Sequence, residues 1–168
     1  MVDKNHAFSN EKIALEPTEE TRRVYDRPFR LEYVVTLAEH QLSTDLHVKN
    51  TSTSSPPIEF QALLHNYIRL PADDVRVTPL RHLTYYDKTQ ATEEAKSLGR
   101  VELREAVDVV QPTDSTYEDA PQDYEIKWPE GEIRLRSKNL KDVVLWNPGE
   151  GGRKIGDMEE GGWYVIIR

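Results

Sequence analysis

The chain has 168 residues, 37% of them hydrophobic, which is enough for one domain with a core, and a second domain is not expected. Its 30 acidic and 22 basic residues give a net charge of −8, and no basic patch interrupts this balance, so binding to nucleic acid or to an anionic membrane is disfavoured. Cysteine is absent from the sequence, which excludes disulfides and thiolate metal sites, and residues 1–12 contain no apolar secretion segment, so a cytoplasmic location is expected.

The hydrophobic pattern predicts short strands along most of the chain. Residues 1–28 fit no strand template and are expected to form a loose tail. Alternating apolar residues then predict strands at 31–37, 42–48, 58–70, 83–86, 101–110, 124–128, 132–136, 143–146 and 163–167, with weak helical periodicity only at 92–98. Turn-forming residues fill the breaks at 51–57, 71–74, 112–121, 129–131 and 148–152. This organisation predicts an all-β, antiparallel β-sandwich, because parallel strands would need crossover helices.

The predicted strand at 58–70 has two different faces. One face is expected to pack into the core and carries Ile58, Phe60, Ala62, Leu64, Ile68 and Leu70, interrupted by Asn66. The other face carries Glu59, Gln61, Leu63, His65, Tyr67 and Arg69. Such a mixture of titratable, amide and aromatic groups suits a wet sheet surface that could hold a polyol. An ordinary exposed face with a hydrogen-bonded histidine also explains the pattern.

Several motifs point to one protein family. Gln61-Ala62-Leu63-Leu64-His65-Asn66-Tyr67 combines an apolar run with a histidine, a small polar residue and an aromatic residue. In chain order the other motifs are Phe29-Arg30-Leu31-Glu32-Tyr33, Tyr86-Asp87-Lys88 and Val143-Val144-Leu145-Trp146-Asn147-Pro148. In these motifs the chain resembles the glucose-6-phosphate 1-epimerases, which are hexose-6-phosphate mutarotases of the aldose 1-epimerase type. Residues 29–168 are therefore expected to form a partial mutarotase-like domain.

The resemblance implies a galactose-mutarotase-like β-sandwich, here a partial supersandwich, that interconverts the α and β anomers of a hexose 6-phosphate such as glucose 6-phosphate. It implies neither a metal nor an organic cofactor. By the motif match His65 takes the position of the catalytic acid, and Asp114 takes that of a carboxylate that binds sugar hydroxyls. Gln61 is a further candidate for substrate binding. The family usually has arginine after this aspartate, whereas this chain has Ser115, and Asp114 could also be a turn residue.

The resemblance also implies a catalytic glutamate that is not found at the expected place. Family members continue after a segment like Trp163-Tyr164-Val165 into a Cys-x-Glu-Pro-Gly-like motif, but this chain has Ile166-Ile167-Arg168. Arginine cannot accept a proton at neutral pH. The family's preceding sheet region, which supplies Gln and Arg residues for the sugar phosphate, also has no counterpart in residues 1–28.

We therefore expect a truncated family member with weak activity or none. Two alternatives remain open: a non-catalytic carbohydrate-binding sandwich, and an interaction protein. In the second case the chain would self-associate through an exposed sheet edge.

Other polar and aromatic residues have simpler interpretations. His40, His47 and His82 are expected to be solvated, and the sequence has no His/Glu spacing typical of a metal site. Trp146 could stack on a sugar ring, but its apolar strand favours core packing. The acidic residues of the predicted strand 101–110 are expected to form a solvated face: Glu102, Glu105 and Asp108.

Overall fold

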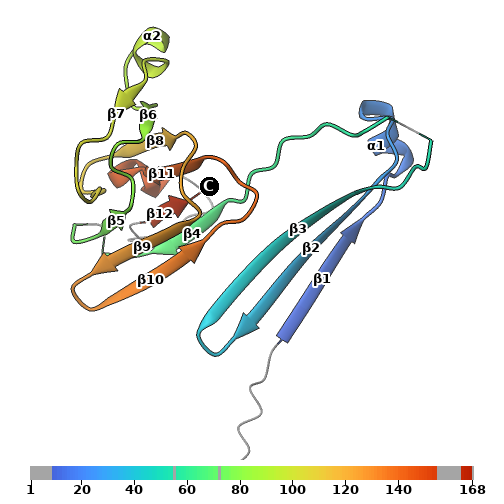
Figure 1. Ribbon diagram of the computed structural model, residues 1–168, viewed down its shortest axis with the longest axis horizontal. Helices are drawn as coiled ribbons and strands as arrows, with labels where there is room; N and C mark the ends of the chain where they lie inside the picture. The colour runs from blue at the N-terminus through green and yellow to red at the C-terminus, as the bar shows by residue number, and fades with distance from the viewer. Residues whose placement is uncertain (1–8, 55, 72, 155–163, 168) are drawn as a thin grey trace, which may run out of the picture. The chain divides into compact units, whose positions relative to one another are not determined.

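The protein is represented by a computed structural model that describes residues 9–54, 56–71, 73–154 and 164–167 (Figure 1). The chain divides into two compact units, residues 1–61 and residues 62–168. Each unit has its own β-sheet structure.

Unit 1 is a three-stranded antiparallel sheet in the order β1-β2-β3. Its strands are β1 (Ser9–Leu15), β2 (Phe29–Ala38) and β3 (Gln41–Asn50), and the short helix α1 (Glu19–Val24) connects β1 to β2. The Thr18 hydroxyl caps this helix by accepting the backbone N–H of Thr21. Strands β2 and β3 form a hairpin that closes where Ala38 pairs with Gln41.

The expectation of a loose tail over residues 1–28 differs from this arrangement. Strand β1 and helix α1 lie within that range, and Ile13 and Leu15 of β1 pair with Tyr33 and Leu31 of β2. The apolar alternation in β1 is short and is interrupted by charged residues, so the pairing to β2 decides its conformation.

Unit 2 contains a six-stranded sheet in the order β4-β12-β11-β8-β6-β7 and a three-stranded sheet in the order β10-β9-β5. The six-stranded sheet consists of β4 (Asn66–Arg69), β6 (Thr84–Asp87), β7 (Arg100–Val101), β8 (Thr113–Tyr117), β11 (Val143–Asn147) and β12 (Tyr164–Ile167). The three-stranded sheet consists of β5 (Arg76–Thr78), β9 (Asp123–Trp128) and β10 (Gly131–Arg136). The short helix α2 (Glu93–Lys96) and a 3-10 turn, η1 (Gly149–Lys154), lie in the connections.

The two sheets of unit 2 share one hydrophobic core. The six-stranded sheet contributes Tyr117, Val143 and Leu145, and the three-stranded sheet contributes Val77 and Ile126. Burial of these side chains between two sheets is the stabilising arrangement of a β-sandwich. The predicted all-β, antiparallel fold is therefore confirmed.

Several predicted boundaries were wrong. Of the predicted strand 58–70 only β4 forms, and Phe60, which was expected in the core, is 58% exposed. Of the predicted strand 101–110 only its first residue lies in a strand, β7. Conversely, residues 113–117 form β8 instead of a turn, because Ser115 and Tyr117 alternate into the core.

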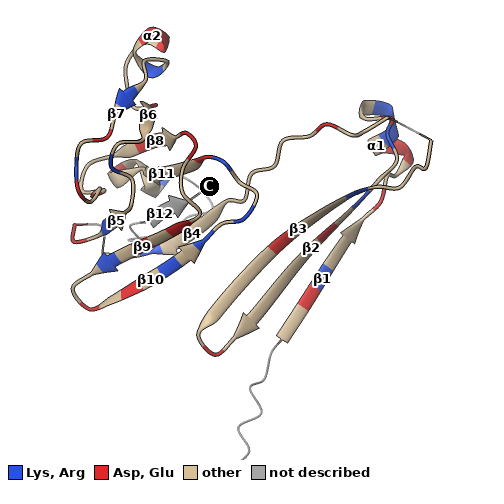
Figure 2. Cartoon of the chain, viewed as in Figure 1, with Lys and Arg blue, Asp and Glu red and all other residues tan. Residues whose placement is uncertain are grey.

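Charged residues of both signs are interspersed along the two units (Figure 2). Within the described residues no helix is long and apolar enough to cross a membrane.

Candidate functional site

His65, the candidate acid, is an exposed residue immediately before β4. The centroid of its imidazole ring lies 4.7 Å from that of the Tyr67 ring, with the two planes tilted by 48°. The side chain is thus outside the apolar core and is held against the first strand of the six-stranded sheet.

Asp114 is the second residue of β8 in the same sheet. The strand register places Asp114 opposite Trp146, Trp146 opposite Ile166, and Ile166 opposite Tyr67. Cross-strand partners point to the same face of a sheet, so Tyr67, Trp146 and Asp114 share one face. Three strand spacings separate the ends of this row, which corresponds to about 14 Å between the Cα atoms of Tyr67 and Asp114. We call Tyr67, Trp146 and Asp114, together with His65, the polar row; the strands that carry its first three members are β4, β11 and β8.

The polar row lies on the face of the six-stranded sheet opposite to the core. The buried side chains of β11 are Val143, Leu145 and Asn147, whereas Trp146 alternates with them and is half-buried. The preferred interpretation of Trp146 as a core residue was therefore wrong. Asp114 is half-buried in a strand, so its interpretation as a turn residue was also wrong.

The loop after β6 adjoins the Asp114 end of the polar row. The backbone N–H of Lys88 donates to the carbonyl oxygen of Asp114 at 2.7 Å, and the Lys88 ammonium lies 5.3 Å from the centroid of the Tyr86 ring. This loop is fixed by Asp87, whose carboxylate accepts hydrogen bonds from Thr89 and Gln90. Burial raises the pKa of Asp87, but these hydrogen bonds outweigh it, so the net pKa is lowered.

Gln61, the third predicted site residue, is not brought to the polar row by the described contacts. It is exposed, lies in no strand and is the last residue of unit 1, whereas His65 and Asp114 belong to unit 2. The position expected for the catalytic base, at Arg168, lies outside the described residues.

A buried carboxylate was missed by the sequence interpretation. Glu102 is 2% exposed, accepts hydrogen bonds from the guanidinium and backbone N–H of Arg104, and accepts another from the Tyr117 hydroxyl at 2.9 Å. Its assignment to a solvated strand face was therefore wrong; Glu105 of the same group is exposed. Because segment 102–110 is irregular rather than a strand, strand alternation does not predict which of its residues are buried.

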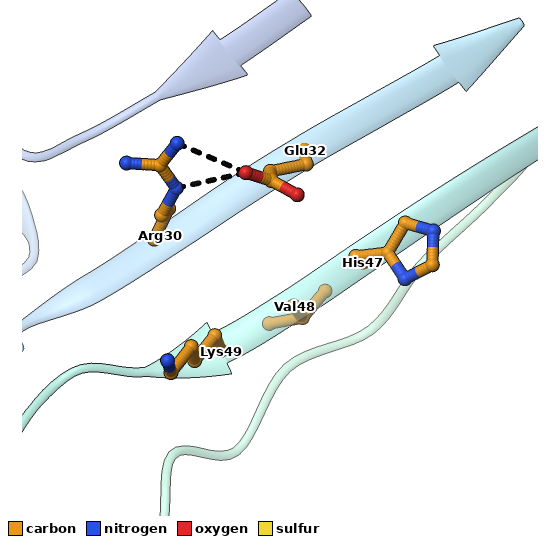
Figure 3. A pocket seen from close by; sticks show the side chains of 5 residues that line it. All are labelled: Arg30, Glu32, His47, Val48 and Lys49. Carbon is orange, nitrogen blue, oxygen red and sulfur yellow. Dashed lines mark hydrogen bonds and ion pairs between the residues drawn. The ribbon is translucent and has the colours of Figure 1, made fainter. Parts of the chain in front are cut away.

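A second polar surface lies on unit 1 (Figure 3). A pocket of about 380 Å³ is lined by Arg30, Glu32, His47, Val48 and Lys49. Arg30 donates to Glu32 at 3.0 Å and to Glu16 at 2.6 Å, which raises the pKa of Arg30 and lowers that of Glu32. His47 is exposed, as expected, and pairs in register with Glu32. Since the cations of this pocket are accompanied by carboxylates that already bind Arg30, the pocket has no strong preference for an anion.

Comparison with known proteins identifies a solved structure with a similar fold. No protein-family model matches the chain, and no curated protein matches it. Among solved structures it is similar to YeaD from Salmonella typhimurium, a protein assigned as a mutarotase, with a TM-score of 0.75 and 20% sequence identity. The match covers 96% of this chain. The chain has a mutarotase-like fold. It spans about half of the matched protein, 54% of that chain.

Within this mutarotase-like fold the structure places His65 immediately before β4 and Asp114 in β8 of the same six-stranded sheet, three strand spacings away. The same sheet adds two aromatic residues, Tyr67 and Trp146, of which the sequence interpretation had kept Trp146 only as an alternative. The sequence holds no clear signal for the outward position of Trp146, because both faces of β11 carry apolar residues; the burial of Asn147, two residues after Leu145, shows which face is inside. No cluster of three or more His, Cys, Asp and Glu side chains suited to a metal ion occurs among the residues that the structure describes.

Proposed function

We propose that this chain is a mutarotase-type protein that binds a hexose 6-phosphate on the polar row. The observation that carries the proposal is the register that aligns Tyr67, Trp146 and Asp114 on one face of a mutarotase-like sheet, with His65 against Tyr67. An aromatic side chain can cover the apolar face of a pyranose, and a neighbouring carboxylate can accept hydrogen bonds from its hydroxyl groups. The spacing of Trp146 and Asp114, which are direct cross-strand neighbours, suits both contacts with one sugar.

His65 is proposed as the acid for ring opening. In mutarotation a base removes the proton of the anomeric hydroxyl, while an acid protonates the ring oxygen; the C1–C2 bond of the open aldehyde then rotates, and closure reverses both proton transfers. Imidazole suits the acid because it can donate and recover a proton near neutral pH. His65 is exposed to the solvent side of the sheet, where a sugar could reach it.

The motif match identifies the proposed acid, His65, but not the base that ring opening also needs. The residue at the position where the resemblance expects the glutamate is Arg168, a cation that cannot accept a proton. Loss of one member of an acid–base pair costs about 10²–10⁴-fold in rate. We therefore propose that this chain, tested alone, binds the sugar but exchanges its anomers slowly or not at all.

Binding is tested by NMR titration of the chain with glucose 6-phosphate, with glucose as the comparison. Amide shifts are expected at Tyr67, Trp146 and Asp114, and Asp114→Asn should weaken binding at least about tenfold, because the amide nitrogen cannot accept a hydrogen bond. Asp108→Asn is the matched control and should bind as the parent does. Absence of shifts along the polar row, or equal effects of both substitutions, would refute the proposed site.

Catalysis is tested separately by anomer-exchange NMR, with the buffer rate subtracted. The parent, His65→Ala and the control His40→Ala are expected to exchange anomers at equal rates. A parent that clearly outpaces His65→Ala would show that a surrogate base exists. The first carboxylates to replace would then be Asp157, Glu159 and Glu160, which lie closest in sequence to the missing motif and outside the described residues.

A non-catalytic carbohydrate-binding sandwich is the second candidate, favoured by the same polar row and by the identity of Arg168. It differs from the first in one measurable respect. If a longer version of the chain that supplies a glutamate after the last strand also fails to accelerate anomer exchange while still binding the sugar, the binding function alone is retained.

A further inference from the structure

The sheet of unit 1 has two chemically different faces. Its register puts Ile13 opposite Tyr33, Tyr33 opposite Leu46, and Leu37 opposite Leu42. Because cross-strand partners and every second residue share a face, one face carries a continuous set of apolar side chains. We call it the apolar face, and its members are Ile13, Leu15, Leu31, Tyr33, Val35, Leu37, Leu42, Leu46 and Val48.

The apolar face carries one charged residue within its strands, Glu11, on the edge strand β1. By the same register the other charged side chains of the three strands lie on the opposite face. They include those of the pocket around Arg30 (Figure 3). The separation of charge from apolar surface is the pattern of a sheet that covers one side and exposes the other.

Much of the apolar face is open to solvent: Ile13 is 70%, Leu42 is 65% and Leu37 is 54% exposed. The members at its centre are half-buried, and Phe29, which alternates onto the same face at the start of β2, is the one large hydrophobic side chain of the described part of unit 1 that is buried. A three-stranded sheet needs an apolar face packed against something to offset the chain entropy lost on folding. The face therefore requires a partner.

We propose that the partner is a second copy of this chain, whose apolar face packs against the first with the strands of the two copies antiparallel. The longest strands have 10 residues, so at about 3.4 Å per residue and about 4.8 Å between strands the face measures about 34 by 14 Å, or about 480 Å². Two such faces bury about 1,000 Å², the lower limit for a specific protein–protein interface. The proposal does not depend on the proposed sugar site.

The chemistry of the face is self-complementary. Along the central strand β2 the apolar face carries Leu31, Tyr33, Val35 and Leu37 in order. A twofold axis that crosses the strands between Tyr33 and Val35 places each leucine opposite the partner's other leucine, and the large Tyr33 opposite the smaller Val35. Large side chains then meet smaller ones at the centre, as close packing requires.

The same axis also keeps the Glu11 carboxylates of the two copies apart. It places Glu11 opposite Ile13 of the partner subunit at the rim, so the two carboxylates do not face one another and can remain in water. Because the face of each copy carries only one carboxylate, charge complementarity does not favour a strongly basic partner. The earlier expectation of self-association through a sheet edge is replaced by association through a face, since the face offers the apolar area.

The test is sedimentation equilibrium of the full chain over a range of concentrations, with two substitutions at adjacent residues of β3. Leu42→Lys places a charge on the apolar face and should raise the dimer dissociation constant at least about tenfold, because that charge would be buried without a partner. Ser43→Lys adds the same charge to the opposite face and should leave the constant within about threefold. Leu42→Ala, which removes area without adding charge, should give an intermediate value.

Far-UV circular dichroism of each variant, recorded at the concentration of the measurement, checks that the strands remain. If Leu42→Lys loses its strand signal, the proposal is judged from the dimer dissociation constants of Leu42→Ala and the parent: an unchanged constant in Leu42→Ala then overturns it. A parent chain that is monomeric at all concentrations overturns the proposal and leaves the face to another part of the same polypeptide. A dimer that both lysine variants weaken equally, or that neither weakens, overturns it as well, since the contact would then lie at an edge or on unit 2.

Discussion

At the scale of single residues, Glu102 is held in unit 2 by several contacts. It is buried, it accepts two hydrogen bonds from the guanidinium of Arg104, and it accepts a further hydrogen bond from the hydroxyl group of Tyr117. Tyr117 is fully buried, and burial together with the negative charge of Glu102 raises its pKa. Tyr117 is therefore a permanent donor to Glu102, and the pair ties the irregular segment after β7 to strand β8.

Replacement of Glu102 by alanine should destabilise the fold by about 1–3 kcal/mol, because the Tyr117 hydroxyl would be left buried without an acceptor. The half-exposed guanidinium of Arg104 can be solvated instead, so the loss of its ion pair should add little to the destabilisation. Urea denaturation measures the loss. Glu105→Ala removes a neighbouring exposed carboxylate that pairs with Arg81, and should cost less than about 1 kcal/mol. Equal losses for the two variants would contradict the assigned role of Glu102.

The same group predicts a dependence of stability on pH. Burial raises the pKa of Glu102, but the hydrogen bonds from Arg104 and Tyr117 outweigh it, so the folded-state pKa lies below the ordinary value of 4.5. A depressed folded-state pKa stabilises the fold above the unfolded-state value and loses that contribution as the pH falls through the folded-state value. The stability difference between the parent and Glu102→Gln should thus be constant near neutrality and shrink below about pH 4.5. A stability difference between the two proteins that grows on acidification would show that the pKa of Glu102 is raised in the folded state, contrary to this prediction.

At the scale of elements, the segment between the two units lacks the pairing that the strands have. Residues 58–65 lie in no strand, although their alternation is as regular as that of β2, and Phe60 is more than half exposed. Apolar alternation makes a strand only where a neighbouring strand supplies backbone partners and a face to cover.

Limited digestion with chymotrypsin should therefore cut first after Phe60, giving a fragment that begins at Gln61, because exposed backbone outside secondary structure fits a protease best. Phe60→Ser should remove this early cut. Tyr25→Ser, at the capped end of α1, should leave it in place. Mass spectrometry of the first fragments identifies the site, and an initial cut within β9 or β11 would contradict the assigned order of the elements.

At the scale of the whole molecule, the net charge of −8 opposes the proposed association of two copies. Added salt shortens the distance over which like-charged chains repel, from about 10 Å at 0.1 M to about 3 Å at 1 M. The dimer dissociation constant should accordingly fall severalfold between these salt concentrations. Weaker association at high salt would instead indicate ion pairs at the contact and point to the face around Arg30.

The sequence alone determined the class of the fold and much of its core. Period-two alternation specifies which side chains of a strand share a face, and this sufficed for β2, β3, β9 and β10, whereas in β11 both faces are apolar and the inner face was assigned wrongly. The motifs of the sequence also named His65 and Asp114 as site residues, and this stays a prediction.

The tertiary structure decided which residues stand next to one another. Tyr67, Trp146 and Asp114 come from three strands far apart in sequence, and only the strand order of the six-stranded sheet puts them in one row. Likewise Glu102 is buried because Arg104 and Tyr117 meet it there, whereas its local sequence resembles an ordinary exposed acidic segment. The alternation of residues along one strand follows from the geometry of that strand alone. Register and burial depend on partner strands that are distant in sequence and are brought together by loop closure, so the sequence of a single strand does not specify them.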